Sequence, residues 1–542
     1  MLRGLASLLA GAALVVSGDG VTPAPSAAVA PPAAGNAPAL GNDTACAALK
    51  GSTVEGASIV EAVAVQDGAL RVSSDIVVPN LPAFCRVRAV SKPTADSEIG
   101  FEVWLPQASA WNQKFLSTGE GGFAGRILYG GAGTDGALDE NLRRGYATAS
   151  TDTGHDGADL HFAVGHPERG ADYLYRAKHV TTVAAKAIIT AYYGRPPVRS
   201  YFSSCSNGGR QGLLEAQLYP KDFDGLILGA PWNNQSRSLV SHLWMRQLLS
   251  VPGAALPPAK LTLLHAAVLK ACDDADGLVD GVINDPGRCR FDPASLRCRN
   301  LDGPTCLTAL QVSTLRKIYD GPRDPRDGAS LFAPYALGQE TGTFGQPDRV
   351  SGFPEQYVAN FVYGDPNWDP ATFDLKRDAP KILAAGRVGD AASTDLSAAR
   401  RRGVKIIQYH GWSDLRIQPG SSTRYYDAVT RANGGLAATR TFYRLFMVPG
   451  MGHCFGDVGA SNFGGVGQQP PPARDSRHDL VTALEAWVER GVAPEEFVAT
   501  KYASPEAGAR TGRFQRRLCA YPAVARYRRG DPADAASFTC ET

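Results

Sequence analysis

Short apolar runs alternate with longer segments of helical periodicity along most of the chain. Apolar runs bounded by glycine, proline or charged residues predict buried strands at 100–105, 114–117, 145–153, 198–203, 226–228, 404–409 and 441–448. Apolar residues at helical spacing predict helices at 173–193, 208–219 and 478–490. Strands that alternate with helices in this way indicate an α/β fold with a mostly parallel sheet.

The alternation of strands and helices fails between residues 232 and 395. This region holds four of the ten cysteines, an aspartate-rich loop and several turns with proline and glycine. A chain of 542 residues is also long for a single hydrophobic core. We therefore predict a main α/β domain formed by 46–231 and 396–542, with 232–395 inserted into it as a second domain.

The first 45 residues have the composition of a targeting segment followed by a linker. Arg3 precedes an apolar run at 5–16, and Ala28-Val29-Ala30 resembles a signal cleavage site, with a cut near residue 17 as the alternative. The run is shorter than the roughly 20 residues that a membrane span needs. We expect a signal peptide at 1–30, an Ala- and Pro-rich linker at 31–45, and export to the periplasm or the medium without a membrane span.

Charge and cysteine content narrow the class of protein. The chain has 55 Lys and Arg residues against 53 Asp and Glu residues, a balance that argues against a nucleic-acid partner. The ten cysteines are an even number in a chain expected to be exported, and they lack the spacing of a zinc site, so we expect disulfides. Proximity in sequence suggests only two local pairs, Cys272–Cys289 and Cys298–Cys306.

The strongest chemical signal is the segment SSCSNGGRQG at 203–212. A predicted strand ends here, a predicted helix begins, and small residues surround Ser206. A nucleophile elbow needs this arrangement, because the strand and the helix pass closely at the strained serine. Ser204 stands where the G-x-S-x-G pattern has glycine, so the segment alone fits an ordinary strand-to-helix connection equally well.

Two later loops supply an acid and a base in the order that α/β-hydrolases use. Asp414 follows one of the last predicted strands, and His453 lies in a glycine loop after the next one. The order Ser206, Asp414, His453 predicts that the histidine takes the serine proton while the aspartate orients the histidine. His410 and His155 compete as bases, but His410 lies on the same strand four residues before the acid, which favours a structural role.

Several separate segments make the chain resemble the tannase and feruloyl esterase family from residue 46 to residue 540. They are CSNGGRQG at 205–212, YPKDFDG at 219–225, GAP at 229–231, DGLVDGVI at 276–283, HGWSD at 410–414, GMGHC at 450–454, RLCAYP at 517–522 and FTC at 538–540. The resemblance implies an α/β-hydrolase core with a lid inserted after the nucleophile helix, and it places the family's triad on Ser206, Asp414 and His453. Ser204 is a small departure, because members of the family commonly have glycine there.

The resemblance also implies the disulfide framework. A bridge between Cys205 and Cys454 would tie the nucleophile loop to the base loop and fix the distance between two members of the triad. The other implied pairs are Cys46–Cys85, Cys272–Cys289, Cys298–Cys306 and Cys519–Cys540.

An oxyanion hole needs a second donor besides the N–H of Asn207. The loop GEGGFAG at 119–125 follows a predicted strand at the corresponding place in the fold. Its glycines let the backbone turn N–H groups towards the serine, although outside this fold it would be an ordinary glycine-rich loop. We expect the donor to be Gly121 or Gly122.

Clustered carboxylates in the segment CDDADGLVDGVIND at 272–285 suit a hard cation such as calcium. Their spacing does not fit an EF-hand, and a solvated acidic turn is the alternative. The family resemblance implies a structural Ca²⁺ in the lid. Its ligands would be the side chains of Asp273, Asp276 and Asp280 and the carbonyl oxygens of Leu278 and Val282.

Phe353, Tyr357, Phe361 and Trp368 belong to an aromatic-rich stretch whose rings could stack on a phenolic substrate, although most of them would serve equally as core of the lid. By resemblance we expect a carboxylic ester hydrolase of small aromatic acyl esters such as feruloyl or galloyl esters. A hydrolase of mono(2-hydroxyethyl) terephthalate is the alternative. A serine peptidase of the same fold and a non-catalytic, calcium-stabilised binding protein are more remote.

Overall fold

A five-stranded parallel sheet carries the segments that the sequence predicts to hold the site. The computed structural model describes residues 41–66, 68–131, 137–340, 344, 352–504 and 512–542. In spatial order the strands of this sheet are β12 (Tyr443–Val448), β11 (Lys405–Gly411), β10 (Gly225–Gly229), β9 (Arg199–Cys205) and β7 (Lys114–Thr118). All five coincide with predicted strands, so the parallel sheet is confirmed.

An antiparallel sheet continues the parallel one beyond β7. Its order is β1 (Thr53–Val54), β2 (Ala57–Val65), β5 (Phe84–Ser91), β6 (Ile99–Pro106) and β8 (Thr148–Thr151). The two sheets join where Phe115 of β7 pairs with Ala147, and the Leu116 N–H donates to the Ala147 carbonyl at 2.9 Å. Of these strands the sequence pattern predicts only β6 and β8; the antiparallel arrangement of the N-terminal part is a finding of the structure.

Neighbouring residues of the central strands pack against helices on opposite faces of the sheet. Leu228 belongs to a buried cluster with residues of α4 (Ala177–Tyr193) and α5 (Asn207–Leu218). The preceding residue, Ile227, belongs to a different buried cluster with residues of α14 (Leu480–Arg490). A strand buried on both faces therefore explains why the sequence of β10 is continuously apolar.

The predicted helices are present with small differences at their ends. The helix predicted at 173–193 consists of a π-helical turn, Asp172–Arg176, followed by α4, and the other two are α5 and α14. Further helices and hairpins complete this part of the fold: α1 (Asp43–Leu49), α2 (Leu138–Arg143), α3 (Pro167–Ala171), α11 (Ser397–Arg402), α12 (Gly420–Ala432), α13 (Leu436–Thr439), β3 (Gly68–Arg71) with β4 (Val77–Leu81), β13 (Glu496–Tyr502) with β14 (Gly512–Cys519), and β15 (Val524–Tyr527) with β16 (Phe538–Glu541).

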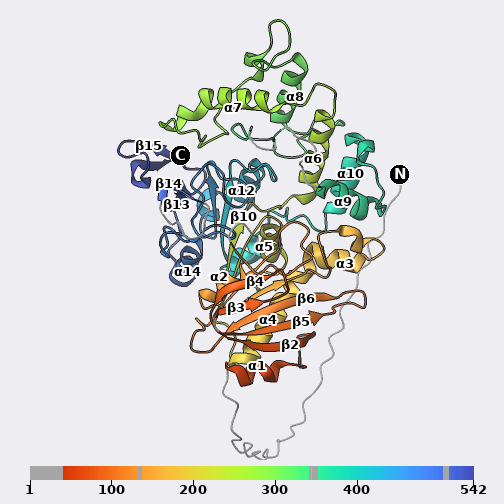
Figure 1. Cartoon of the computed structure of the whole chain (residues 1–542), viewed down its shortest axis with the longest axis vertical. Coiled ribbons are helices and arrows are strands. Elements are labelled where there is room, and N and C mark those ends of the chain that lie inside the picture. The colour runs from red at the N-terminus through yellow and green to blue at the C-terminus, as the bar shows by residue number, and fades with distance from the viewer. Residues whose placement is uncertain (1–40, 67, 132–136, 341–343, 345–351, 505–511) are drawn as a thin grey trace, which may run out of the picture. The chain divides into compact units, whose positions relative to one another are not determined.

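The segment predicted as an insertion, 232–395, is helical and has no strand within its described residues (Figure 1). Its helices are α6 (Gln235–Leu249), α7 (Pro258–Cys272), α8 (Ala309–Asp320), α9 (Phe353–Tyr357) and α10 (Leu375–Gly386). It contacts the loop after β11, where Gln339 Nε2 donates to the Asp414 carbonyl at 2.6 Å. The chain from Ala39 to Thr542 forms one compact unit, and the boundaries at 232 and 395 stay a prediction.

All five disulfide pairs implied by the family resemblance are present. They are Cys46–Cys85, Cys205–Cys454, Cys272–Cys289, Cys298–Cys306 and Cys519–Cys540. Within the described residues, no helix has the length and apolar character that a membrane crossing requires. The signal peptide predicted at 1–30 and most of the linker at 31–45 lie outside the described residues.

Candidate active site

Ser206 occupies the sharp turn between β9 and α5. Its backbone has φ 63° and ψ −125°, a strained conformation for a residue with a side chain. Close packing at the turn requires small neighbours: a Cβ at Gly208 would lie 1.9 Å from Ser204 Oγ, and one at Gly209 would lie 2.7 Å from the Gly229 carbonyl. The predicted elbow is therefore present, and Ser204 fits where the family commonly has glycine because position 208 has no side chain.

The structure brings the three predicted residues together in one hydrogen-bonded row. His453 Nε2 lies 2.8 Å from Ser206 Oγ, and His453 Nδ1 lies 2.7 Å from Asp414 Oδ2. Asp414 follows β11, and His453 lies in the loop after β12. The disulfide between Cys205 and Cys454 joins the residue before the serine to the residue after the histidine.

Asp414 is fully buried and remains the charged member of this row. Its Oδ1 accepts hydrogen bonds from the N–H groups of Arg416 at 2.8 Å and Ile417 at 3.0 Å. Burial acts to raise the pKa of Asp414, but the adjacent His453 and His410 outweigh it and hold that pKa well below its ordinary value. The carboxylate is thus available to stabilise a protonated His453.

The two competing histidines are occupied elsewhere. His410 is fully buried, and its Nε2 contacts Asp414 Oδ2 at 3.0 Å rather than the serine. His155 Nε2 contacts the Phe123 carbonyl at 2.8 Å, and its ring stacks on Phe162 with centroids 3.8 Å apart. Burial lowers the pKa of His155 to about 4. Geometry therefore favours His453 as the base.

The predicted oxyanion loop lies against the start of α5. Asn207 Nδ2 donates to the Glu120 carbonyl at 3.0 Å, and the Glu120 N–H donates to Gln211 Oε1 at 3.1 Å. Within the described part of the chain, the backbone N–H groups of Asn207, Gly121 and Gly122 have no protein acceptor. Free N–H groups next to the serine and on the loop held against the start of α5 suit an oxyanion.

Two buried cations that the sequence analysis missed brace this loop and the elbow. Arg210 Nε donates to Asn207 Oδ1 at 2.8 Å. Lys178 Nζ donates to the Thr118 carbonyl at 2.6 Å and lies 3.1 Å from Glu120 Oε1. Arg210 stands in the motif after the serine, which is the signal that could have singled it out, whereas Lys178 lies in an otherwise ordinary helix.

The four predicted aromatic residues divide into one near the site and three in or near the core of the helical segment. Phe353 packs on the oxyanion loop, where its ring centroid lies 4.7 Å from that of Phe123. Tyr357 is buried in the core, and Phe361 stacks on it at 5.3 Å. Trp368 stacks on Tyr363 at 5.9 Å. Phe353 is thus the member of the set whose place suits a substrate contact.

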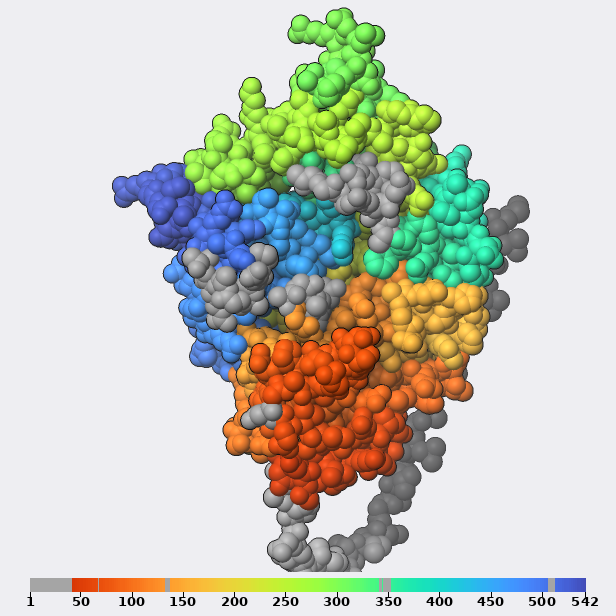
Figure 2. Space-filling view, in the orientation of Figure 1, coloured from red at the N-terminus to blue at the C-terminus, as the bar shows by residue number. Residues whose placement is uncertain are grey.

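The predicted calcium loop folds as one turn of carboxylates beside the C-terminal strands. Asp273 Oδ2 accepts the Gly281 N–H at 2.9 Å, and Asp276 Oδ1 accepts the Leu278 N–H at 3.0 Å. Asp280 Oδ2 pairs with Arg516 Nη2 of β14 at 2.6 Å, and Figure 2 shows the green helical segment adjoining these blue strands at the surface. Burial and the like charges of Asp280 and Asp273 raise the pKa of Asp276 to about 6. Three carboxylates share the charge of one arginine here, so the all-oxygen donor set keeps an excess of negative charge, which fits a hard cation.

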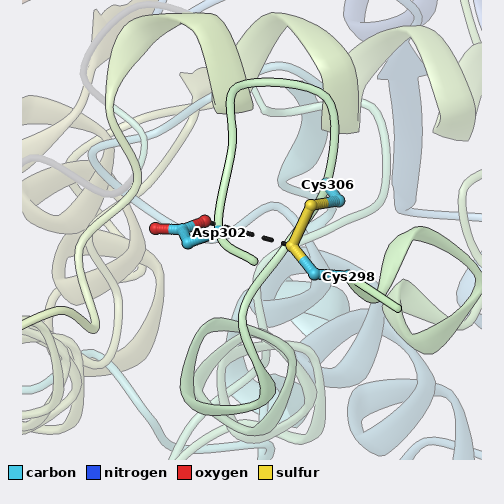
Figure 3. Close-up of side chains that lie close together, drawn as sticks. All are labelled: Cys298, Asp302 and Cys306. Carbon is cyan, nitrogen blue, oxygen red and sulfur yellow. Dashed lines mark hydrogen bonds between the residues drawn. A yellow bond between two sulfur atoms is a disulfide. The ribbon is translucent and has the colours of Figure 1, made fainter. Parts of the chain in front are cut away.

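Among the described residues, carboxylate oxygens of the calcium loop do not all approach within 4.8 Å of one another, whereas two other groups do. In one, Cys298 and Cys306 form a disulfide beside Asp302 (Figure 3), so neither sulfur is a thiolate that could bind a metal. In the other, His179 Nδ1 lies 2.6 Å from Asp222 Oδ2 near the buried Glu215, and Lys186 Nζ donates to the Asp222 carbonyl. The Lys186 ammonium already supplies positive charge to this group, so it does not call for a metal ion.

The class of protein follows from the row of serine, histidine and aspartate at the carboxyl end of a parallel sheet, which is the arrangement of serine hydrolases. The family follows from comparison with known proteins. The family model described as tannase and feruloyl esterase matches residues 85–541, and the chain belongs to this family.

Individual relatives agree. The chain is 41% identical over 532 residues to an uncharacterised esterase of Xanthomonas campestris, covering 92% of this chain and 91% of that protein. It is 36% identical over 449 residues to a probable feruloyl esterase B-2 of Aspergillus flavus, covering 78% and 81%. The crystal structure of feruloyl esterase B from Aspergillus oryzae matches with a TM-score of 0.84 at 28% identity, covering 92% of this chain and 100% of that one. The protein is therefore a carboxylic ester hydrolase of the feruloyl esterase and tannase type.

Proposed function

We propose that the protein hydrolyses esters of small aromatic acids through an acyl-enzyme on Ser206. The observation that carries this proposal is the 2.8 Å contact between His453 Nε2 and Ser206 Oγ, with Asp414 on the other nitrogen of the ring. His453 takes the proton of Ser206 as Oγ attacks the ester carbonyl. Asp414 holds the ring in the tautomer that can accept this proton and stabilises the imidazolium.

The tetrahedral intermediate carries its negative charge on the former carbonyl oxygen. We assign the N–H of Asn207 and that of Gly121 or Gly122 as its donors. Asn207 follows the serine, its side chain holds the loop that carries the glycines, and these N–H groups have no other acceptor among the described residues. Collapse of the intermediate expels the alcohol, which receives the proton from His453. Water then attacks the acyl-enzyme with His453 again as base, and the acid leaves.

An aromatic acyl group is favoured by the rings beside the proposed oxyanion hole. A Cβ at Gly122 would lie 3.2 Å from Phe353 Cζ, and the Phe353 ring lies 6.0 Å from that of Trp232. The backbone N–H of Trp232 donates to the Ser206 carbonyl. Planar acyl groups gain from such aromatic walls. The names of the relatives, feruloyl esterases, point to the same substrate class.

The helical segment 232–395 is proposed as a lid over this site, with Phe353 as its contact to the acyl group. We further propose that it holds a structural Ca²⁺ through Asp273, Asp276 and Asp280 and the carbonyl oxygens of Leu278 and Val282. The ion would neutralise the clustered carboxylates and brace the loop against β14, and no step of the hydrolysis depends on it. Export of the protein is consistent with its five disulfides.

The test is the initial rate of hydrolysis of methyl ferulate, methyl gallate and mono(2-hydroxyethyl) terephthalate, with Ser206→Ala as control. We expect one of the first two esters to be cleaved well and the variant to lose almost all turnover. The best rate on the terephthalate monoester would replace the proposed substrate class. More than a few per cent of wild-type activity in Ser206→Ala would disprove the nucleophile.

A further inference from the structure

His410 shares with His453 a single oxygen of the buried acid. His410 Nε2 lies 3.0 Å from Asp414 Oδ2, and His453 Nδ1 lies 2.7 Å from the same atom. We propose that His410 is a positioning residue of the ester hydrolysis: acting through Asp414, it fixes the carboxylate against His453 and limits how strongly that carboxylate holds a proton on the base. The inference rests on the proposed triad.

The groups around the His410 ring determine which of its nitrogens carries the proton. Tyr443 O–H donates to Gln408 Oε1, and Gln408 Nε2 donates to Ser422 Oγ at 2.7 Å. His410 Nε2 faces two acceptors, Asp414 Oδ2 at 3.0 Å and the Ile417 carbonyl at 3.1 Å, so Nε2 carries the ring proton. Nδ1 is then an acceptor, and the Ser422 hydroxyl, 2.7 Å away, donates to it.

The Nε2 proton of His410 lies between Asp414 Oδ2 and the Ile417 carbonyl, and it completes the donors around the carboxylate. Asp414 Oδ1 accepts the N–H groups of Arg416 and Ile417, and Oδ2 accepts both histidines, so the four lone pairs of the carboxylate all have donors. The aspartate has no exposed surface. Loss of the His410 donor would leave a more basic and less constrained carboxylate.

Apart from the two histidines that contact it, the titratable groups near this carboxylate are uncharged near neutral pH. They are His242 of α6 and Tyr335, with Tyr443 at the far end of the chain of hydrogen bonds. Burial lowers the pKa of His242 to about 4 and raises that of Tyr335 well above its ordinary value. The hydrogen bond from His410 therefore changes the negative charge that Asp414 presents to His453, separately from these uncharged groups.

The sign of the effect follows from charge. When Asp414 loses one of four donors, more of its negative charge acts on the imidazolium of His453, so protonation of the base becomes easier. Protonated His453 cannot accept the proton of Ser206. The acid limb of the kcat/KM profile should therefore move to higher pH, by about one unit.

The experiment compares His410→Phe, which keeps a ring but removes both polar atoms, with His410→Gln, whose amide retains a donor for Asp414. Functional sites are counted by the burst of a chromogenic aryl ester, and kcat, KM and the pH profile are measured on the best ester of the wild type. For His410→Phe we expect kcat per titrated site to fall about ten- to a hundredfold with KM little changed, together with the shifted acid limb. His410→Gln should restore most of both properties.

Two further variants keep the test decisive. His179→Phe replaces a histidine that pairs with Asp222 and stacks on Tyr219, so it should leave the acid limb in place. Ser422→Ala removes the hydroxyl that donates to His410 Nδ1, which makes the Nε2–H a weaker donor to Asp414. It should shift the limb in the same direction by a smaller amount, and it can be measured even if His410→Phe fails to fold.

An unchanged acid limb in His410→Phe or, if that variant does not fold, in Ser422→Ala would overturn the inference, because a merely structural histidine would alter stability alone. Failure of the proposed function is a different result: Ser206→Ala would keep its activity in the same assay.

Discussion

Cys205 and Cys454 are joined by a disulfide, and the residues that follow and precede them, Ser206 and His453, are hydrogen-bonded at 2.8 Å. The bridge closes a sequence separation of 249 residues directly beside the proposed nucleophile and base. The bridge therefore holds the loop after β9 and the loop after β12 at a fixed distance before any substrate binds, as the transfer of the serine proton to the histidine requires.

The double variant Cys205→Ala/Cys454→Ala should lose both stability and turnover. Removing a cross-link over so long a loop costs roughly 3–5 kcal/mol of unfolding free energy. We expect kcat to fall about tenfold or more in the protein that remains folded, because the 2.8 Å contact loses its covalent support. Urea unfolding and initial rates check both effects.

Cys298→Ala/Cys306→Ala is the matched control, because that bridge spans only 8 residues in the helical segment. It should cost less stability and leave kcat unchanged. Wild-type kcat in the folded Cys205→Ala/Cys454→Ala protein would show that packing alone sets the geometry of serine and histidine.

Asn207 contributes its side chain as well as its backbone to the proposed oxyanion hole. Its Nδ2 donates to the Glu120 carbonyl, which directly precedes Gly121. Asn207→Ala should lower kcat about ten- to a hundredfold with little change in KM, because the loop would no longer hold its N–H groups for the transition state. Steady-state kinetics on the best ester separates the two constants.

Asn433→Ala is the control for this substitution. Asn433 is also buried and donates from Nδ2 to a backbone carbonyl, that of Thr394, but it lies at the end of α12. It should lose stability and keep kcat. An equal loss of kcat in both variants would argue against a specific role for the Asn207 amide.

Chelation tests the proposed calcium site. Removal of bound metal should lower the melting temperature, because Asp273, Asp276 and Asp280 would again repel one another. Asp276→Asn should give the same low melting temperature with or without calcium, whereas Asp274→Asn, an exposed neighbour outside the proposed ligand set, should keep the response. Calorimetry with and without added calcium provides the measurement, and a melting temperature unchanged by complete metal removal would contradict the site.

Local sequence was sufficient to predict the site residues that each lie on one loop after a strand. Ser206, Asp414 and His453 each follow an apolar strand, and the parallel sheet brings the ends of those strands to one edge. The contacts that brace them were not predictable in this way. Lys178 reaches Glu120 across 58 positions, and nothing in the helix that carries it distinguishes it from a surface lysine.

The hydrophobic pattern also failed to predict most strands of the N-terminal sheet and to separate the aromatic residues of the site from those of the core. β2 alternates buried and exposed positions only in its first half, and its buried residues pack in a core shared with α1, so its sequence carries no clear strand pattern. Phe353, Tyr357 and Phe361 recur at helical spacing, which places them on one face of a helix but does not tell core from site. Only tertiary packing puts Phe353 on the oxyanion loop and Tyr357 in the core.

Asp152 makes the stability of the folded protein depend on pH between about 4 and 7. Burial raises its pKa to about 7, although its Oδ1 accepts the N–H groups of Gly100 at 2.9 Å and Gly154 at 2.7 Å. In the unfolded chain the same carboxyl titrates at its ordinary value, near 3.9. Between these values the folded state retains a proton that the unfolded state has lost, so this residue's contribution to the unfolding free energy falls as pH rises from about 4 to about 7.

Asp152→Asn should remove this contribution, because an amide Oδ1 can accept both N–H groups and does not titrate. The variant should be more stable than the wild type at pH 8, and the difference should shrink as the pH is lowered to 4. Urea unfolding across this pH range measures it. Asp369→Asn, at an exposed carboxylate that accepts the Ala371 N–H at 2.9 Å, is the control and should not reproduce the change. An Asp152→Asn difference that stays constant from pH 4 to pH 8 would show that the buried carboxyl does not titrate in this range.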